Sequence, residues 1–92
     1  MEFSVHIPFV ELLGFELLSM DGGEAEIAFA PADEHLNSFD VVHGGASMTL
    51  MDVVMAHAAR SVEPAMGCVT IEMKTSFMRA ARGQLLAKGK LL

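Results

Sequence analysis

The feature that most constrains the fold is the segment from Gly45 to Arg60, which contains no proline and places apolar residues on every helical face. These apolar residues are Ala46, Met48, Leu50, Met51, Val53, Val54, Met55, Ala56, Ala58 and Ala59. A helix that is apolar all round is a buried helix. We therefore expect the rest of the chain to wrap around it.

Two shorter segments lie near the N-terminus. Ile7 to Leu13 reads as a short helix, because Pro8 falls in its first turn and Gly14 follows its last residue. The stretch from Pro31 to Asp40 is polar and rich in helix breakers, so it is predicted to be a loop that contains one helical turn.

Between these segments the sequence predicts a β-hairpin. Phe15 to Met20 and Glu24 to Ala30 flank Asp21-Gly22-Gly23, a turn sequence that favours a tight connection. The second strand alternates strictly, so that Ala25, Ile27 and Phe29 point inward and Ala28 points outward.

Two more strands are expected after the long helix. Gly67 to Phe77 alternates between the two faces, residues 81–83 form a turn, and Gln84 to Leu92 forms a last strand. Strands with short connections around one helix indicate an α+β fold with an antiparallel sheet. We expect residues 1–92 to form a single domain.

Composition indicates an oligomer. The chain has 92 residues, and 52% of them are hydrophobic. A globule of this length buries only roughly two-thirds of the surface that its unfolded chain exposes. Because that is more apolar material than a small monomer hides, we expect an oligomer.

The sequence offers no sign of a membrane protein or a secreted one. No run approaches the ~18 apolar residues of a membrane span, and no basic region of a signal peptide follows Met1. The expected location is cytoplasmic. The single cysteine, Cys68, is expected to be a small buried residue, because it has no second cysteine to pair with.

Charge is distributed unevenly along the chain. Residues 1–59 carry ten acidic residues and no Lys or Arg, whereas residues 60–92 carry all six basic residues and two acidic ones, giving charges of −10 and +4. A net charge of −6 without Trp or Tyr argues against nucleic acid as a partner. The basic part either contacts a small anionic ligand or forms a solvated face.

Asp52 is the most informative single position. It lies in the middle of the apolar helix, where an ionised carboxylate is costly unless it is paired or its surroundings favour the neutral form. Carboxylates in such surroundings concentrate at functional sites, although structural ion pairs produce them too.

His43-Gly44-Gly45 precedes this helix directly. Backbone N–H groups in the first helical turn lack intrahelical partners and add to the helix dipole, so they can stabilise an oxyanion. Glycine at this position is also consistent with plain capping. Gly44 and Asp52 are eight residues apart, which is about 12 Å of helix rise. One carbonyl group does not easily reach both, so the two groups are expected to come from different subunits.

The string Asn37-x5-His43-Gly44-Gly45-x6-Asp52, followed by VTIEMKTSFMR at residues 69–79, resembles the hotdog-fold acyl-CoA thioesterases of the phenylacetic-acid-degradation type. The resemblance covers nearly the whole chain from the N-terminal helix onward. It implies a hotdog fold, an antiparallel sheet wrapped around one long helix. It also implies a homodimer or homotetramer with active sites at the dimer interface.

The resemblance also implies roles for individual residues in the hydrolysis of acyl-CoA to free acid and CoA. The N–H of Gly44 polarises the thioester carbonyl, and Asp52 of the partner chain acts as general base or as nucleophile. Asn37 and His43 orient the substrate or the water. Thr70 matches a small hydroxyl residue that positions the water beside the carboxylate. No cofactor is implied.

Contacts with the rest of the substrate are less specific in the sequence. Gly45 is a candidate to assist Gly44 at the carbonyl. The candidates for the CoA phosphates are basic side chains of the C-terminal third. These are Arg79, Arg82, Lys88 and Lys90.

The chain departs from the family pattern at several points. Val53 stands where many relatives have a hydroxyl residue, and Ala80 replaces the usual proline. The family also has two further strands beyond the one that ends here at Leu92. These departures keep open a non-catalytic acyl-thioester-binding domain of the same fold.

Two other chemistries are less favoured. His43 is compatible with a hydroxyacyl-thioester dehydratase, which uses a histidine beside a similar helix-end site. A metal site built from His35, His43, His57 and Asp40 lacks the spacing that metal ligands favour, so no metal is expected. His57 is better explained as a core or interface histidine.

Overall fold

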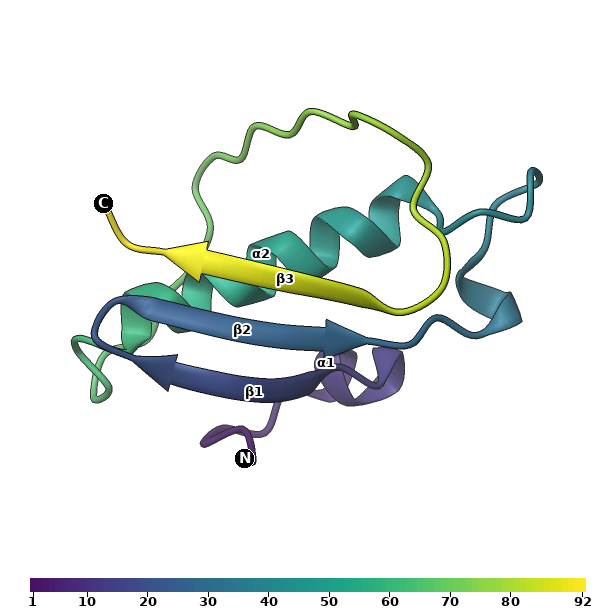
Figure 1. Ribbon diagram of the computed structural model, residues 1–92. Coiled ribbons are helices and arrows are strands. Elements are labelled where there is room, and N and C mark those ends of the chain that lie inside the picture. The colour runs from purple at the N-terminus through teal and green to yellow at the C-terminus, as the bar shows by residue number, and fades with distance from the viewer.

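The computed structural model describes residues 1–92. A three-stranded antiparallel sheet in the order β1-β2-β3 packs against one long helix (Figure 1). The helix, α2 (Gly44–Arg60), contacts chiefly β2 (Glu24–Phe29) and β3 (Leu85–Lys90). The edge strand β1 is Glu16–Asp21. The α+β class and the antiparallel sheet predicted from the sequence are confirmed.

The short elements form where the sequence predicts them. Helix α1 (Pro8–Leu13) has Pro at its start and ends at Gly14, which is left-handed with φ 74°. The N–H of Gly14 donates to the Glu11 and Val10 carbonyls, which closes the helix as a glycine C-cap does. A 3-10 turn, η1 (Asp33–His35), supplies the helical turn expected in the following loop.

The hairpin turn is built on two glycines. Gly22 and Gly23 have φ of 57° and 86°, and Asp21 pairs with Glu24 across them. Two successive positive φ values are what a two-residue type I′ turn requires. Ala28 lies on the strand face opposite to Ile27 and Phe29 and is not part of the core cluster, as predicted, yet it is buried. Its methyl group is small, and it is flanked in the sheet by Glu16 of β1 and Leu86 of β3.

The core lies between the sheet and one face of α2. Its largest fully buried side chains include Phe29, Leu17, Ile27 and Val54. Helix α2 buries Leu50, Val54, His57 and Ala58 on this face. The expectation that α2 is buried all round does not hold within one chain, because the sheet covers one face only. On the other face Met55 is 46% exposed.

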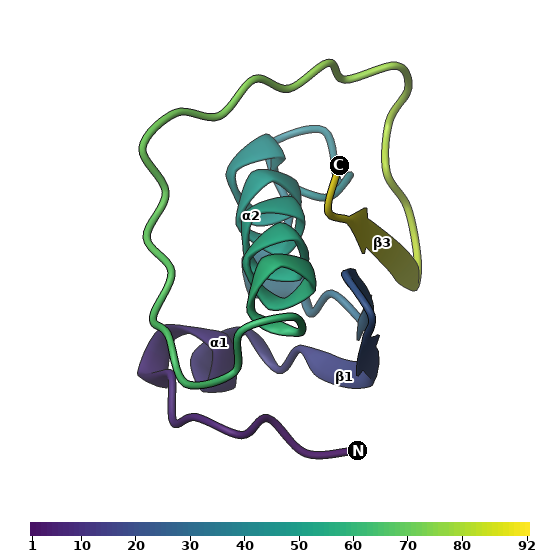
Figure 2. The same cartoon turned by 90° about the vertical axis from the view of Figure 1, so that its left-hand side faces the viewer.

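The segment from Gly67 to Phe77 is not a strand, contrary to the sequence prediction. It runs from the end of α2 around the side of the helix that faces away from the sheet and returns to β3 (Figure 2). Alternation favours a strand only where a neighbouring strand pairs with it, and β3 pairs only with β2. Ile71 is accordingly 97% exposed, and Cys68, which we expected to be buried, is exposed as well.

The final strand is confirmed, since β3 spans Leu85–Lys90 and follows a turn in which Gly83 has φ 65°. Gly89 packs so closely on α2 that an added Cβ would lie 2.7 Å from the Val54 carbonyl oxygen. None of the helices is long and apolar enough to cross a membrane.

Candidate functional site

The N-terminus of α2 offers one free amide donor. His43 is the N-cap, and its Nδ1 accepts the N–H of Gly45 at 2.8 Å. The N–H groups of Ala46 and Ser47 donate to the His43 carbonyl. The N–H of Gly44 has no partner in the chain. Of the two glycine amides proposed for an oxyanion, Gly44 is therefore the one that remains available to a ligand.

The ring of Phe77 lies beside Gly44. A Cβ added at Gly44 would lie 3.5 Å from Cζ of Phe77, which is ordinary van der Waals contact. The long segment after α2 therefore returns to the start of the same helix. An apolar ring next to the free amide lowers the local dielectric and strengthens any hydrogen bond formed there.

Asn37 and His43 lie on one loop that is held by hydrogen bonds. Asn37 Oδ1 accepts the N–H groups of Phe39 at 2.8 Å and Val41 at 3.3 Å, so this atom holds the loop. The N–H of His43 donates to the His35 carbonyl at 2.9 Å. The side-chain amide nitrogen of Asn37 has no partner in the chain and stays available as a donor.

Asp52 and Thr70 form the second half of the site. The Thr70 hydroxyl donates a hydrogen bond to Oδ1 of Asp52. Both residues line a cavity of about 450 Å³ together with Met55, Ala56 and residues 68–72. Asp52 is half-buried, and no Lys or Arg pairs with it. From the sequence, we expect the Asp52 carboxylate either to be paired or to lie in surroundings that favour its neutral form. The structure pairs it with the Thr70 hydroxyl.

The two halves of the site are not joined within one chain. Gly44 opens α2 and Asp52 lies eight residues further along, about 12 Å of helix rise. The cavity at Asp52 contains neither Gly44 nor His43. The structure thus brings Thr70 to Asp52, whereas Asn37 and His43 share the loop before α2 and lie apart from that pair.

The basic candidates are spread over the C-terminal third. Arg79 and Arg82 are exposed and form no ion pair. Lys88 lies 3.8 Å from Glu26 on the outer face of the sheet, and Lys90 stands on the same strand. The four side chains do not converge on a single pocket.

No group of three metal-binding side chains occurs in the structure. His57 is a core residue, as predicted. It is 2% exposed, its Nδ1 lies 2.8 Å from the Val53 carbonyl, and its ring packs edge-on against Phe3.

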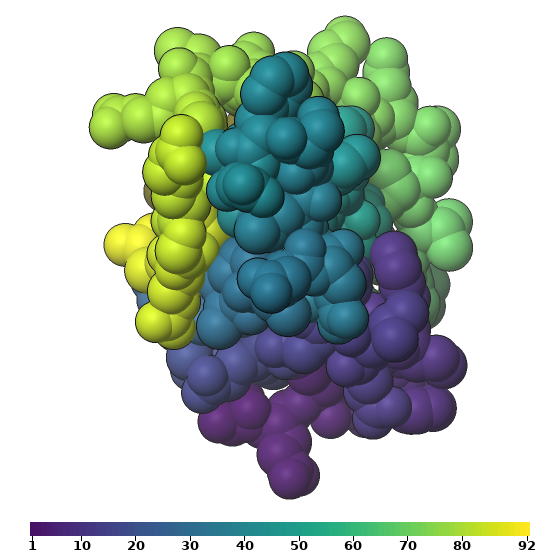
Figure 3. All heavy atoms as spheres, turned by 90° about the vertical axis from the view of Figure 1, so that its right-hand side faces the viewer, coloured from purple at the N-terminus to yellow at the C-terminus, as the bar shows by residue number.

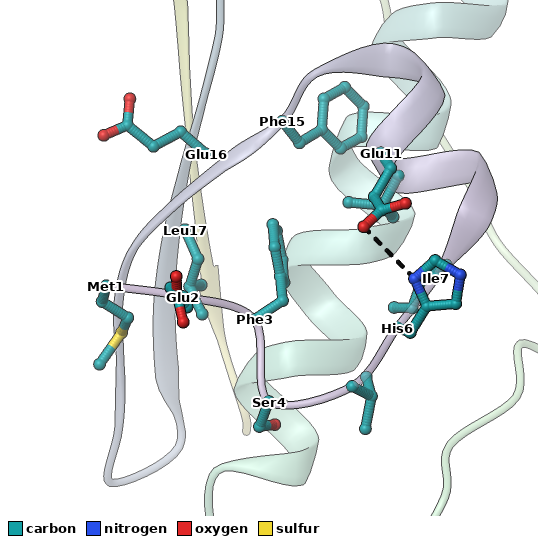
Figure 4. Close-up of a pocket in the computed structure, with 12 residues that line it drawn as sticks. Met1, Glu2, Phe3, Ser4, His6, Ile7, Glu11, Phe15, Glu16 and Leu17 are labelled. Atoms are coloured by element: carbon teal, nitrogen blue, oxygen red, sulfur yellow. Dashed lines mark ion pairs between the residues drawn. The ribbon is translucent and has the colours of Figure 1, made fainter.

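A larger cavity lies under the N-terminal segment (Figure 4). It measures about 500 Å³, and Phe3, Phe15 and Leu17 supply much of its apolar wall. The His6–Glu11 ion pair, 3.3 Å long, lies at its edge. None of the residues predicted for the site lines it.

Sequence reasoning missed one residue near the site, His35, which it considered only as a metal ligand. The side chain of His35 lies against the Phe29 ring and lines a cavity with His43. His35 and His43 flank the loop before the helix whose first amide is proposed to bind the oxyanion. This placement in the sequence was a usable signal for a role of His35 near the site. The cavity itself depends on α1, which is remote in sequence, and no local pattern reveals it.

An antiparallel sheet packed on one long central helix, with a glycine amide free at the helix start, is the architecture of the hotdog thioesterases. The sequence pattern of the Thioesterase superfamily matches residues 39–92. The chain belongs to this family.

Solved structures agree with this assignment. A conserved protein of Pseudomonas aeruginosa is 33% identical and superposes with a TM-score of 0.85, covering 90% of this chain and 68% of that protein. The PaaI protein of the Escherichia coli phenylacetic acid degradation operon is 27% identical with a TM-score of 0.79, covering 87% and 58%.

A curated relative is also similar. A protein of Archaeoglobus fulgidus named "Putative esterase" is 35% identical over 71 residues. The match covers 77% of this chain and 45% of that protein, so the chain spans about half the length of this relative.

Proposed function

We propose that the chain hydrolyses acyl-CoA thioesters at a site formed between two copies. The observation that carries this proposal is the placement of complementary groups on α2: an unpartnered Gly44 amide at its start and the Asp52–Thr70 pair along it. Membership of the thioesterase superfamily supports the reaction class. The separation of the two groups along α2 favours Asp52 from the partner copy.

The chemistry follows from these groups. Asp52 takes a proton from water while the water oxygen attacks the thioester carbonyl carbon. The carbonyl oxygen becomes an oxyanion that accepts the Gly44 N–H, where the helix dipole adds to the stabilisation. The C–S bond then breaks, and CoA leaves as a thiolate that takes up the proton from Asp52. The products are the free acid and CoA.

Thr70 acts on Asp52 and on the water. Its hydroxyl hydrogen is donated to Asp52, so its oxygen keeps lone pairs that can accept a hydrogen bond from the attacking water. Asn37 and His43 orient the substrate from the loop before α2. Arg79 and Arg82, exposed and without ion pairs, are proposed to contact the CoA phosphates.

A thiol-release assay over a panel of acyl-CoAs tests this function, with Gly44→Pro and Asp52→Asn as variants. Proline is well tolerated at the first position of a helix, and His43 already has ψ 135°, which suits a residue before proline. The Gly44→Pro variant thus removes the free N–H and no hydrogen bond of the fold.

We expect the Gly44→Pro variant to keep its thermal unfolding midpoint and to lose about 10²–10³ in kcat, the usual loss for an oxyanion donor. Asp52→Asn is expected to lose about 10²–10⁴. Acyl-CoA binding without thiol release by the unmodified chain would point instead to the non-catalytic domain.

A further inference from the structure

A small cavity lies where α1, η1 and the start of α2 meet. Figure 3 shows this end of the molecule, with the loop before α2 between the N-terminal segment and the segment that leads into β3. The cavity measures about 200 Å³. We call it the α1–α2 cavity. It is lined by Phe9, Leu13, Glu34, His35, His43, Gly45, Ala46 and Thr49.

The two histidines of this cavity both use Nδ1 as an acceptor, which leaves Nε2 as the donor. Nδ1 of His43 accepts the Gly45 N–H at 2.8 Å, and Nδ1 of His35 accepts the Ala32 N–H at 2.9 Å. An imidazole whose Nδ1 accepts a hydrogen bond carries its proton on Nε2. Each neutral ring therefore offers one Nε2–H.

The Nε2 atom of His35 is unused within the chain. It forms no hydrogen bond, and its nearest charged neighbour is the Glu34 carboxylate at 3.9 Å. The fully buried polar side-chain atoms that lack a hydrogen-bond partner are His57 Nε2 and Thr75 Oγ1. Because His35 Nε2 also lacks a partner but is not among them, it is accessible from the surface. His35 is otherwise held firmly, with 11% of its side chain exposed and its ring against Phe29. A fixed, reachable donor beside a carboxylate suits a hydroxyl, which can accept from one group and donate to the other.

We propose that the α1–α2 cavity receives the acyl group of the thioester, and that His35 and Glu34 select acyl groups that end in a hydroxyl. The inference rests on the proposed thioesterase function. The cavity begins at Gly45, next to the free Gly44 amide, so an acyl group whose carbonyl binds there can enter it. Phe9, Leu13 and Ala46 supply an apolar wall for its hydrocarbon part.

The cavity suits the acyl end of the substrate better than the CoA end. It contains no Lys or Arg, and the charge of Glu34 repels phosphate groups. Its volume of about 200 Å³ accommodates roughly six to seven heavy atoms at about 30 Å³ each, slightly more than the benzene that a 150 Å³ cavity holds. A six-carbon acyl group is the expected optimum.

Two substitutions separate the roles of the two His35 nitrogens. In the His35→Asn variant an amide oxygen can replace Nδ1 as the acceptor for Ala32, but the Nε2–H is lost. In the His35→Gln variant an amide nitrogen can replace the Nε2 donor. The probes are hexanoyl-CoA and 6-hydroxyhexanoyl-CoA, compared by the ratio of their kcat/KM values.

The unmodified chain and the His35→Gln variant should prefer the hydroxylated probe by about tenfold, and the His35→Asn variant should show no preference. Equal kcat/KM values for the two probes in the unmodified chain would overturn the role of His35. The same comparison by calorimetry, with non-hydrolysable thioether analogues, reports on the subsite even if no thiol is released. Lack of thiol release with the binding preference intact would therefore refute hydrolysis and support the subsite.

The size of the cavity is tested at Leu13. The Leu13→Phe variant fills the cavity, and the Leu13→Met variant keeps its volume as the matched control. We expect Leu13→Phe to lower the ratio of kcat/KM for hexanoyl-CoA to kcat/KM for acetyl-CoA about tenfold. An equal loss on both substrates, or no loss on either, would show that the acyl group does not enter this cavity.

Discussion

The Thr70 hydroxyl donates a hydrogen bond to the Asp52 carboxylate across 18 residues of sequence. Asp52 is on the helix, and Thr70 belongs to the extended segment that passes around it. This bond ties that segment to α2 at the carboxylate proposed to act as general base. It fixes the rotamer of Asp52 and leaves its second oxygen free for a proton.

Removal of this bond should impair catalysis more than stability. We expect the Thr70→Val variant to lose about tenfold in kcat, because one hydrogen bond to a charged group that orients the base is lost. Thr70 is exposed, so the unfolding midpoint should not change. The Thr70→Ser variant keeps the hydroxyl and should restore most of the rate. A fully active Thr70→Val variant would remove Thr70 from the site.

The His43 side chain should stabilise α2 as its N-cap. The His43→Ala variant loses the acceptor for the Gly45 N–H and should cost about 1 kcal/mol in free energy of unfolding, measured by urea titration. The His43→Asn variant supplies an oxygen acceptor, so its stability should be close to that of the unmodified chain. Equal stability of the alanine and asparagine variants would contradict the capping role.

The contact of β3 with α2 should be sensitive to one methyl group. An added Cβ at Gly89 would lie 2.7 Å from the Val54 carbonyl oxygen and 3.0 Å from its carbon, and backbone atoms cannot move aside cheaply. We expect the Gly89→Ala variant to lose roughly 1–3 kcal/mol of stability. Gly67→Ala is the matched control, since nothing lies within 4 Å of its added Cβ. Similar urea midpoints for the two variants would show that β3 does not pack on α2 this closely.

Local signals in the sequence predicted most of the fold. Pro8 and Gly14 bound α1, the two glycines of the hairpin take the positive φ values that its turn needs, and the apolar run gives α2. These features depend on neighbours in sequence. The segment from Gly67 to Phe77 was predicted wrongly because its alternation reports a tendency to form a strand, whereas pairing needs a partner strand elsewhere.

In the candidate site, too, the features that follow from local sequence were predictable and those that depend on distant contacts were not. The spacing of Gly44 and Asp52 along a helix follows from helix geometry, so their separation was predictable. The contact of Thr70 with Asp52 entered through a family resemblance, and the structure contains it. The pairing of His35 with His43 around the loop was visible in the sequence, but the role proposed for His35 was not, because it depends on the partners of its two ring nitrogens and on a cavity closed by α1.

The most direct test of the central claim mixes two inactive variants, Gly44→Pro and Asp52→Asn, unfolded and refolded together. If each site combines Gly44 of one copy with Asp52 of the other, half of the mixed dimers are hybrids with one intact site, and thiol release should return to about a quarter of the unmodified rate. Each variant refolded alone should stay inactive. A mixture as inactive as its components, with hybrid dimers present by mass spectrometry, would contradict a site shared between two copies.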